Sequence, residues 1–202
     1  MPRKPHPFGK EYHSIADGAT EKSLEGKPIM WRVKIQEGKD RPKKPDGSWA
    51  FPSEFPGYSK TATLILETTK PVQHTGKVIS MDSGLCVSVG IIAMQNFCMY
   101  GQSLIKKQRY WPKNVPGEAI SSYFANKELG SAKTFRQVFD GKPFLVHCHK
   151  EDRYVTKIMS THGLINEIST HKTYRRVAGE WKTFNYTEPI SRHSHSKIRW
   201  MM

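Results

Sequence analysis

The sequence predicts a mixed α/β domain. Apolar segments of strand length alternate with helical segments, in the order strand, helix, strand, helix, strand, strand. With 37% hydrophobic residues, the 202-residue chain can bury a core, while its 13 prolines and 15 glycines indicate many loops. No internal repeat is present. We therefore expect one large domain, or one domain with extensions.

The amino-terminal third contains one predicted strand and one predicted helix. Residues 1–14 are basic and proline-rich, and we expect an extended arm. Apolar and basic residues alternate over Ile29–Ile35, which predicts a half-exposed strand. Residues 37–56 are rich in glycine, proline and charge, and are expected to be a loop. The β-branched residues of Lys60–Thr69 allow a strand, but the length and the spacing of alanine and leucine favour a helix.

The middle of the chain predicts a strand, a turn and a helix. Lys77–Met81 is expected to be a short strand and Leu85–Tyr100 a helix, with Ser83 as its N-cap. Gly101 stands where such a helix would end.

The second half of the chain contributes mainly strands. Gln102–Lys107 is expected to be a strand and Glu118–Lys127 a short helix. Two adjacent strands are predicted at Pro143–Cys148 and Arg153–Met159, joined by a charged turn. Beyond residue 163 the sequence is polar, and only Thr183–Tyr186 is expected to be a strand.

The charge of the chain indicates an anionic partner. Lysine and arginine number 32 against 18 acids, a formal net charge of +14, so nucleic acid is the simplest partner. One loop interleaves cations with aromatic rings, a pattern suited to phosphates and stacked bases. The alternative is a solvated basic turn in which the tryptophan packs into the core. The candidate DNA-binding residues of this loop are Lys106, Lys107, Arg109, Tyr110, Trp111 and Lys113.

Asp82 is the candidate catalytic residue and metal ligand. It follows a predicted strand directly and precedes a predicted helix, a position where α/β folds place ligand sites. A carboxylate there suits Mg²⁺ or Mn²⁺, which prefer oxygen ligands and act in pairs on phosphodiesters. The alternative is an aspartate that caps the helix without any catalysis. The sequence alone favours the cap.

Other sites are disfavoured by the sequence. His147 and His149 would share one face of a strand and Cys148 the other, so the three cannot converge on zinc. Three widely spaced cysteines and no signal peptide predict an intracellular protein without disulfides. No apolar run reaches the roughly 20 residues of a membrane span. Nucleophile-elbow and phosphate-loop motifs are absent from the sequence.

Four segments carry a resemblance to transposases of the piggyBac type. Residues 1–9 resemble the family's Lys-Pro-x-x-x-Gly segment, and residues 76–86 resemble its second catalytic strand. Residues 105–117 and 150–159 resemble later strands. Most members have Asp-Asn-Phe-x-Thr-Ser where this chain has Asp82-Ser-Gly-Leu-Cys. The resemblance spans residues 1–190, taken as a partial catalytic domain, and leaves residues 191–202 as a polar tail.

The resemblance implies an RNase H-like fold, a mixed sheet with flanking helices that is incomplete here. It implies DNA as the partner, Mg²⁺ or Mn²⁺ held by three aspartates, a nuclear location and a possible homodimer. Only Asp82 corresponds to one of the three aspartates. The first would precede Met1, and no aspartate follows Asp152. We therefore expect that this chain is not a competent transposase by itself, and that a non-catalytic DNA-binding module is the alternative.

Overall fold

The structure is a computed structural model that describes residues 11–16, 30–36, 45–47, 54–106, 117–163, 168–187 and 190. The chain divides into two compact units, Met1–Pro71 and Val72–Met202. The predicted tail at residues 191–202 lies outside the described residues. Within the described residues, no helix has the length and apolar character needed to span a membrane.

The first unit contains an antiparallel strand pair. β1 (Glu11–Ala16) pairs with β2 (Met30–Gln36), with Ser14 opposite Val33. β2 confirms the strand predicted at residues 29–35. The predicted arm is corrected over its last residues, because residues 11–14 are paired in β1 and do not extend alone. Its remainder, residues 1–10, lies outside the described residues.

A helix, α1 (Lys60–Thr68), completes the described part of this unit. The hydroxyl of Ser59 caps it by accepting a hydrogen bond from the backbone N–H of Ala62, at 3.4 Å. At the other end, the Thr69 hydroxyl donates to the Ile65 carbonyl at 2.8 Å, and a short 3-10 turn, η2 (Lys70–Val72), follows. The predicted helix is confirmed. Its buried apolar side chains are Ala62, Ile65 and Leu66.

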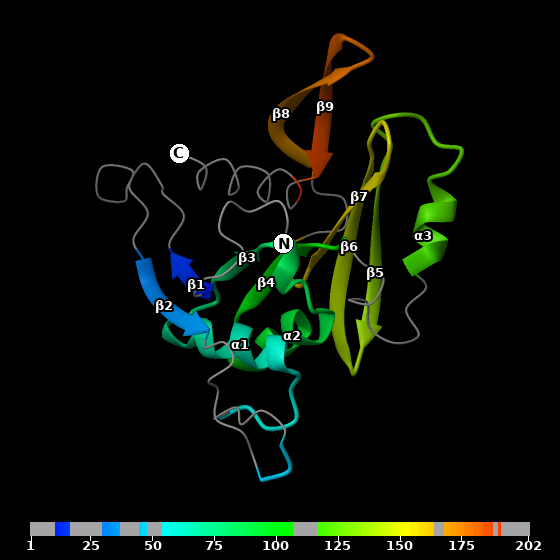
Figure 1. The fold of residues 1–202 in the computed structure, drawn as a ribbon. Helices are drawn as coiled ribbons and strands as arrows, with labels where there is room; N and C mark the ends of the chain where they lie inside the picture. The colour runs from blue at the N-terminus through cyan, green and yellow to red at the C-terminus, as the bar shows by residue number, and fades with distance from the viewer. Residues whose placement is uncertain are drawn as a thin grey trace. The chain divides into compact units, whose positions relative to one another are not determined.

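The second unit is built on a five-stranded mixed sheet (Figure 1). The two strands at one edge run parallel, and every other neighbouring pair is antiparallel. The strands in spatial order are β3 (Val78–Met81), β4 (Tyr100–Leu104), β7 (Val155–Ser160), β6 (Lys142–Lys150) and β5 (Ala132–Phe139). The predicted mixed α/β class is confirmed.

The connection between β3 and β4 differs from the prediction of one helix at residues 85–100. It consists of three short pieces, η3 (Ser83–Leu85), α2 (Ser88–Ala93) and η4 (Met94–Phe97). Val87 has extended backbone angles, which separate η3 from α2, and Cys98 adopts the left-handed conformation at φ 49°, which ends the crossover. Parallel strands need such a crossover, but it need not be a continuous helix.

Two predicted helix boundaries are wrong for the same reason. Ser83 lies inside η3 and does not cap α2, whose N-cap position is held by Val87. Gly101 lies within β4 and does not terminate a helix. A Cβ atom on Gly101 would lie 2.8 Å from the Met94 sulfur and 3.1 Å from a methyl of Ile91, so this glycine allows the crossover to pack closely on the sheet.

The remaining strands of the sheet include one that was not predicted from the sequence. β6 and β7 confirm the predicted strand pair, and β4 begins two residues before its predicted start. β5 was not predicted, because it mixes polar with apolar residues, none of them fully buried, and becomes a strand by pairing with β6. The helix predicted at residues 118–127 is shorter, since α3 ends at Tyr123 (Gly117–Tyr123).

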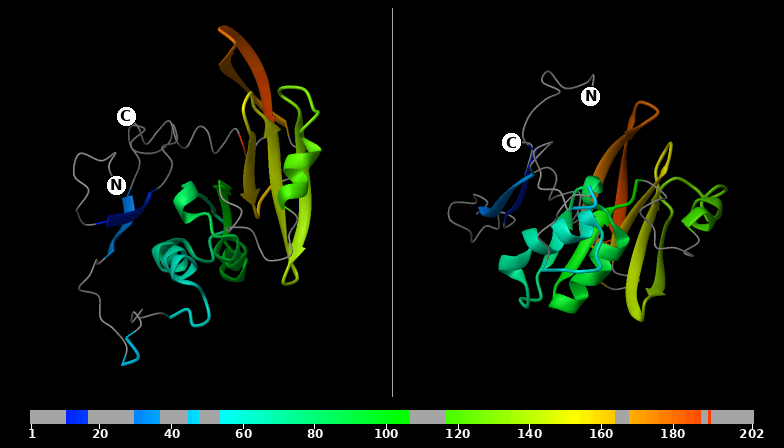
Figure 2. Two further views of the ribbon diagram at one scale, coloured as in Figure 1. Left: turned by 45° about the vertical axis from the view of Figure 1, so that its right-hand side comes forward. Right: turned by 60° about the horizontal axis from the view of Figure 1, so that its bottom comes forward.

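A hairpin of two strands, β8 (Ile168–Val177) and β9 (Glu180–Thr187), projects past the end of the sheet (Figures 1 and 2). β9 confirms and lengthens the strand predicted at residues 183–186, whereas β8 was missed. The turn residues Ala178 and Gly179 both have positive φ, 50° and 90°, as a tight hairpin turn requires. At its base, the hairpin joins a buried apolar cluster of Ile158, Phe184, Tyr186 and Ile190.

Candidate functional site

Asp82 lies at the carboxyl end of the parallel pair β3–β4. The pairing places Met81 opposite Ser103 of β4, and the buried Ser103 hydroxyl lies 3.1 Å from the carbonyl oxygens of both Met81 and Asp82. The Asp82 carbonyl also accepts a hydrogen bond from the Leu85 N–H at 2.9 Å. The backbone at Asp82 is therefore fixed by β4 on one side and by η3 on the other.

The carboxylate of Asp82 is exposed and does not cap η3, although it directly precedes this turn. Asp82 occupies the N-cap position of η3 but forms no capping hydrogen bond with its side chain. The Ser83 hydroxyl lies 3.5 Å from one carboxylate oxygen, at the limit of a hydrogen bond. The capping interpretation, which the sequence favoured, is therefore wrong. The carboxylate is open to an external ligand.

The described residues do not form a metal centre around this carboxylate. No group of three or more histidine, cysteine, aspartate or glutamate side chains that could hold an ion occurs within the described ranges. Mg²⁺ needs near-octahedral oxygen ligation, and one carboxylate cannot clamp two ions. Asp82 can therefore serve as one ligand of a metal site, but the described residues do not complete that site.

The basic and aromatic loop is described only at its first residue. Lys106 is exposed and follows Ile105, whose N–H donates to the Lys157 carbonyl at 2.8 Å. Lys106 therefore leaves the sheet beside the strand end that carries Asp82. The other predicted DNA-binding residues, Lys107, Arg109, Tyr110, Trp111 and Lys113, lie outside the described residues.

The segment His147-Cys148-His149 is buried in β6. Nδ1 of His147 shares a hydrogen bond of 2.9 Å with the Thr134 hydroxyl, and burial lowers the pKa of His147 to about 4. His149 lies edge-on to the rings of Phe184 and Tyr186, at centroid separations of 5.7 and 4.4 Å. Each histidine therefore serves in the packing of the sheet.

The buried thiols of this unit are chemically inert. Burial raises the pKa of Cys148 to about 12, although Lys157 acts in the opposite direction. Burial likewise raises the pKa of Cys86 to about 11, against a hydrogen bond with Ser103. Both cysteines are free and protonated at neutral pH, so neither is a nucleophile.

One candidate surface, on the β8–β9 hairpin, was not predicted from the sequence. The register places one set of alternating residues on a single face, and all of them are exposed. We call this set the ribbon face. Its residues are Lys172, Tyr174, Arg176, Trp181, Thr183 and Asn185. The signal was present as alternation in two neighbouring segments, but exposed alternation alone does not predict which residues pair.

Comparisons with known proteins define the class as transposases. The model of the transposase IS4 family matches residues 1–196, and the chain belongs to this family. It is similar over 98% of its length to a cryo-EM structure of the piggyBac transposase synaptic complex with hairpin DNA, with a TM-score of 0.63 and 12% identity. The chain covers 34% of that transposase chain. Comparison with curated proteins gave no match.

These findings confirm the predicted resemblance to the piggyBac type. The fold of this chain is that of the corresponding part of the piggyBac transposase, and the protein is derived from a transposase. The chain spans about a third of the length of the solved transposase.

Proposed function

We propose that this chain is a DNA-binding part of a DDE-type transposase that contributes one metal ligand, Asp82, and has no strand-transfer activity by itself. The family match and the charge of +14 support DNA as its partner. The solved relative is a complex with hairpin DNA. An RNase H-like arrangement of the sheet is part of the same proposal, supported by the parallel pair β3–β4 with an acid at its end.

One observation carries this proposal. The Asp82 carboxylate is exposed at the end of β3, without a capping hydrogen bond, while the described residues supply no group of ligands around it. Mg²⁺ or Mn²⁺, when bound, would supply Lewis-acid stabilisation of phosphodiester oxygens. The other ligands would come from outside the described residues or from another polypeptide. Asp82 itself would present oxygen to the ion from a backbone held by Ser103.

The test combines DNA binding with DNA cleavage. A labelled duplex is titrated with the chain at several salt concentrations, and a supercoiled plasmid is incubated with the chain and Mg²⁺ or Mn²⁺. We expect the logarithm of the affinity to fall linearly with the logarithm of salt concentration, and no nicking. Asp82→Asn is expected to leave both results unchanged, as is the matched control Asp152→Asn, which removes another exposed carboxylate.

Two outcomes would contradict the proposal in different ways. Nicking that depends on the metal and disappears in Asp82→Asn, but not in Asp152→Asn, would show that the chain is a competent nuclease. Failure to bind DNA at low salt would exclude both the nuclease and the alternative of a non-catalytic DNA-binding module.

A nuclear location and a homodimer belong to the same proposal. A protein that binds chromosomal DNA acts in the nucleus of a nucleated cell, which fluorescence microscopy of the tagged chain tests directly. Sedimentation velocity tests the dimer, for which a concentration-dependent shift to twice the monomer mass is expected.

A further inference from the structure

The β8–β9 hairpin has two faces of opposite character. Phe184 and Tyr186 are buried on one face, where they pack against Ile158 and Ile190. On the other face, the ribbon face, Tyr174 is 63% exposed and Trp181 is 72% exposed. The two rings are diagonal neighbours, because Tyr174 pairs with Thr183 and Trp181 precedes Thr183 by two residues. Exposed aromatic residues grouped in this way mark a binding surface.

The ribbon face is also basic. Lys172 and Arg176 flank the tyrosine, one on each side along β8, and both are exposed. Arg176 is held against the turn, where its Nε donates to the Gly179 carbonyl at 3.0 Å. The one acid of the hairpin, Glu180, pairs with Val177 and thus belongs to the opposite face. The ribbon face therefore combines two cations and two rings without a carboxylate.

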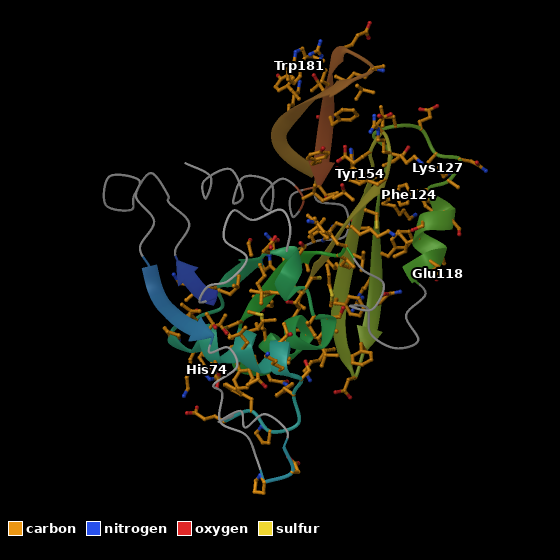
Figure 3. The ribbon with its side chains drawn as sticks, in the orientation of Figure 1. His74, Glu118, Phe124, Lys127, Tyr154 and Trp181 are labelled. Carbon is orange, nitrogen blue, oxygen red and sulfur yellow. The ribbon has the colours of Figure 1, made fainter. Side chains whose placement is uncertain are left out.

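The hairpin is anchored at its base, so this face has a defined direction. The hydroxyl of the buried Tyr186 donates to a Glu151 carboxylate oxygen at 3.0 Å, and the same oxygen accepts from the Thr156 hydroxyl at 3.3 Å. The ring of Phe184 packs closely on Gly130, where an added Cβ would lie 3.1 Å from it. Trp181 lies near the far end of the hairpin, away from these contacts (Figure 3).

We propose that the ribbon face binds DNA through unpaired bases, with Tyr174 and Trp181 as stacking platforms and Lys172 and Arg176 on the phosphates. This inference rests on the proposed function and identifies the surface through which the chain would bind DNA. Diagonal positions of an antiparallel pair are roughly 7–8 Å apart. This separation is about twice the roughly 3.4 Å between stacked bases, so the two rings suit bases of one extended strand that are no longer stacked on each other.

The charge and the exposed rings of the ribbon face distinguish between three binding partners: a second copy of the chain, a DNA duplex and a single strand. A second copy of the chain would bring the same Lys172 and Arg176 against themselves, and like charges in contact oppose docking. A duplex offers phosphates, but its bases are stacked on one another, and their faces cannot reach the two exposed rings. A strand with unpaired bases matches both the cations and the rings.

The experiment compares a fluorescein-labelled single strand of about 20 nucleotides with the duplex of the same sequence, using the full chain. Trp181→Ala and Tyr174→Ala are each expected to weaken single-strand binding about tenfold and to change duplex binding less than twofold. Trp181→Phe, which keeps a ring, is expected to retain most of the affinity. Tyr154→Ala is the matched control, since Tyr154 is also 63% exposed but lies in the β6–β7 turn.

Circular dichroism and the melting temperature verify that each variant folds. If the folded Trp181→Ala chain bound the single strand as tightly as the wild-type chain does, the inference would be overturned. The proposed function would still stand, because the wild-type chain binds DNA. An equal loss in Tyr154→Ala would overturn the assignment to the ribbon face, and a loss restricted to the duplex would overturn the choice of unpaired bases. If the wild-type chain bound neither DNA, the proposed function itself would fail.

Discussion

The hydroxyl of Ser103 lies 3.1 Å from the main-chain carbonyl of Asp82, and thereby ties the carboxyl end of β3 to its parallel neighbour β4. Ser103 is fully buried, and its hydroxyl is also 3.1 Å from the Met81 carbonyl. The position of the candidate metal ligand is thus set by a residue more than twenty positions away along the chain.

Ser103→Ala removes this contact and is expected to lower the free energy of unfolding by about 1–2 kcal/mol, because the buried Met81 carbonyl and the part-buried Asp82 carbonyl lose a donor. Urea denaturation followed by tryptophan fluorescence measures the change. Ser122→Ala is the control, since the exposed Ser122 hydroxyl makes a hydrogen bond of 3.3 Å to a carbonyl within its own helix. Equal stability of the two variants would contradict a structural role for Ser103.

Gly101→Ala tests the packing of the crossover on the sheet. The new methyl would lie 2.8 Å from the Met94 sulfur and 3.1 Å from Met81 and Ile91. The methionine side chains can yield, so we expect a loss of about 1 kcal/mol, at the low end for overpacking. Gly84→Ala is the control, because its Cβ would meet only a carboxylate oxygen at 3.8 Å. A Gly101→Ala chain as stable as Gly84→Ala in urea would refute the close packing.

The burial of His147 predicts that the stability of the fold depends on pH. Burial lowers its pKa in the folded state to about 4, below the ordinary value of 6.5. Between these two values the unfolded chain binds the proton and the folded chain does not, so stability falls as the pH is lowered from 6.5 to 4. Above pH 6.5 the histidine is neutral in both states and contributes no slope. The full effect is about 3 kcal/mol at most.

Urea titrations at pH 7, 6, 5 and 4 measure this slope. His147→Gln is expected to be less stable at pH 7, because it disturbs the contact with Thr134, but to lose less stability on acidification. If His147→Gln kept the wild-type slope, another group would be responsible.

Tyr186→Phe tests the anchor of the β8–β9 hairpin. The change removes the hydroxyl that donates to the Glu151 carboxylate at 3.0 Å, and hydrogen bonds to charged groups contribute about 1.5–3 kcal/mol. We expect a loss of that size in urea and faster proteolysis within the hairpin. Tyr174→Phe removes an exposed hydroxyl and is expected to change neither. Cleavage at the wild-type rate in Tyr186→Phe would argue against the anchor.

The sequence by itself determined the fold class and most of the buried strands. β3, β6 and β7 each contain neighbouring apolar residues, and the burial of such side chains drives a segment into a sheet, whereas β4 is a strand despite its polar Gln102 and Ser103. Helix α1 was predictable because its cap and its apolar spacing are local features. The transposase family was also evident from short motifs in order, and the comparison confirmed it.

The tertiary structure alone decided the rest, because pairing and exposure depend on contacts between distant residues. β5 and β8 mix polar with apolar residues and become strands by pairing with β6 and β9. The crossover after Asp82 is broken by backbone conformations at Val87 and Cys98 that no residue type there prescribes. These arrangements explain why the Asp82 carboxylate is exposed and caps no helix, and why the ribbon face forms. The sequence supplies the residues, but the pairing of the strands determines which side chains are exposed to solvent.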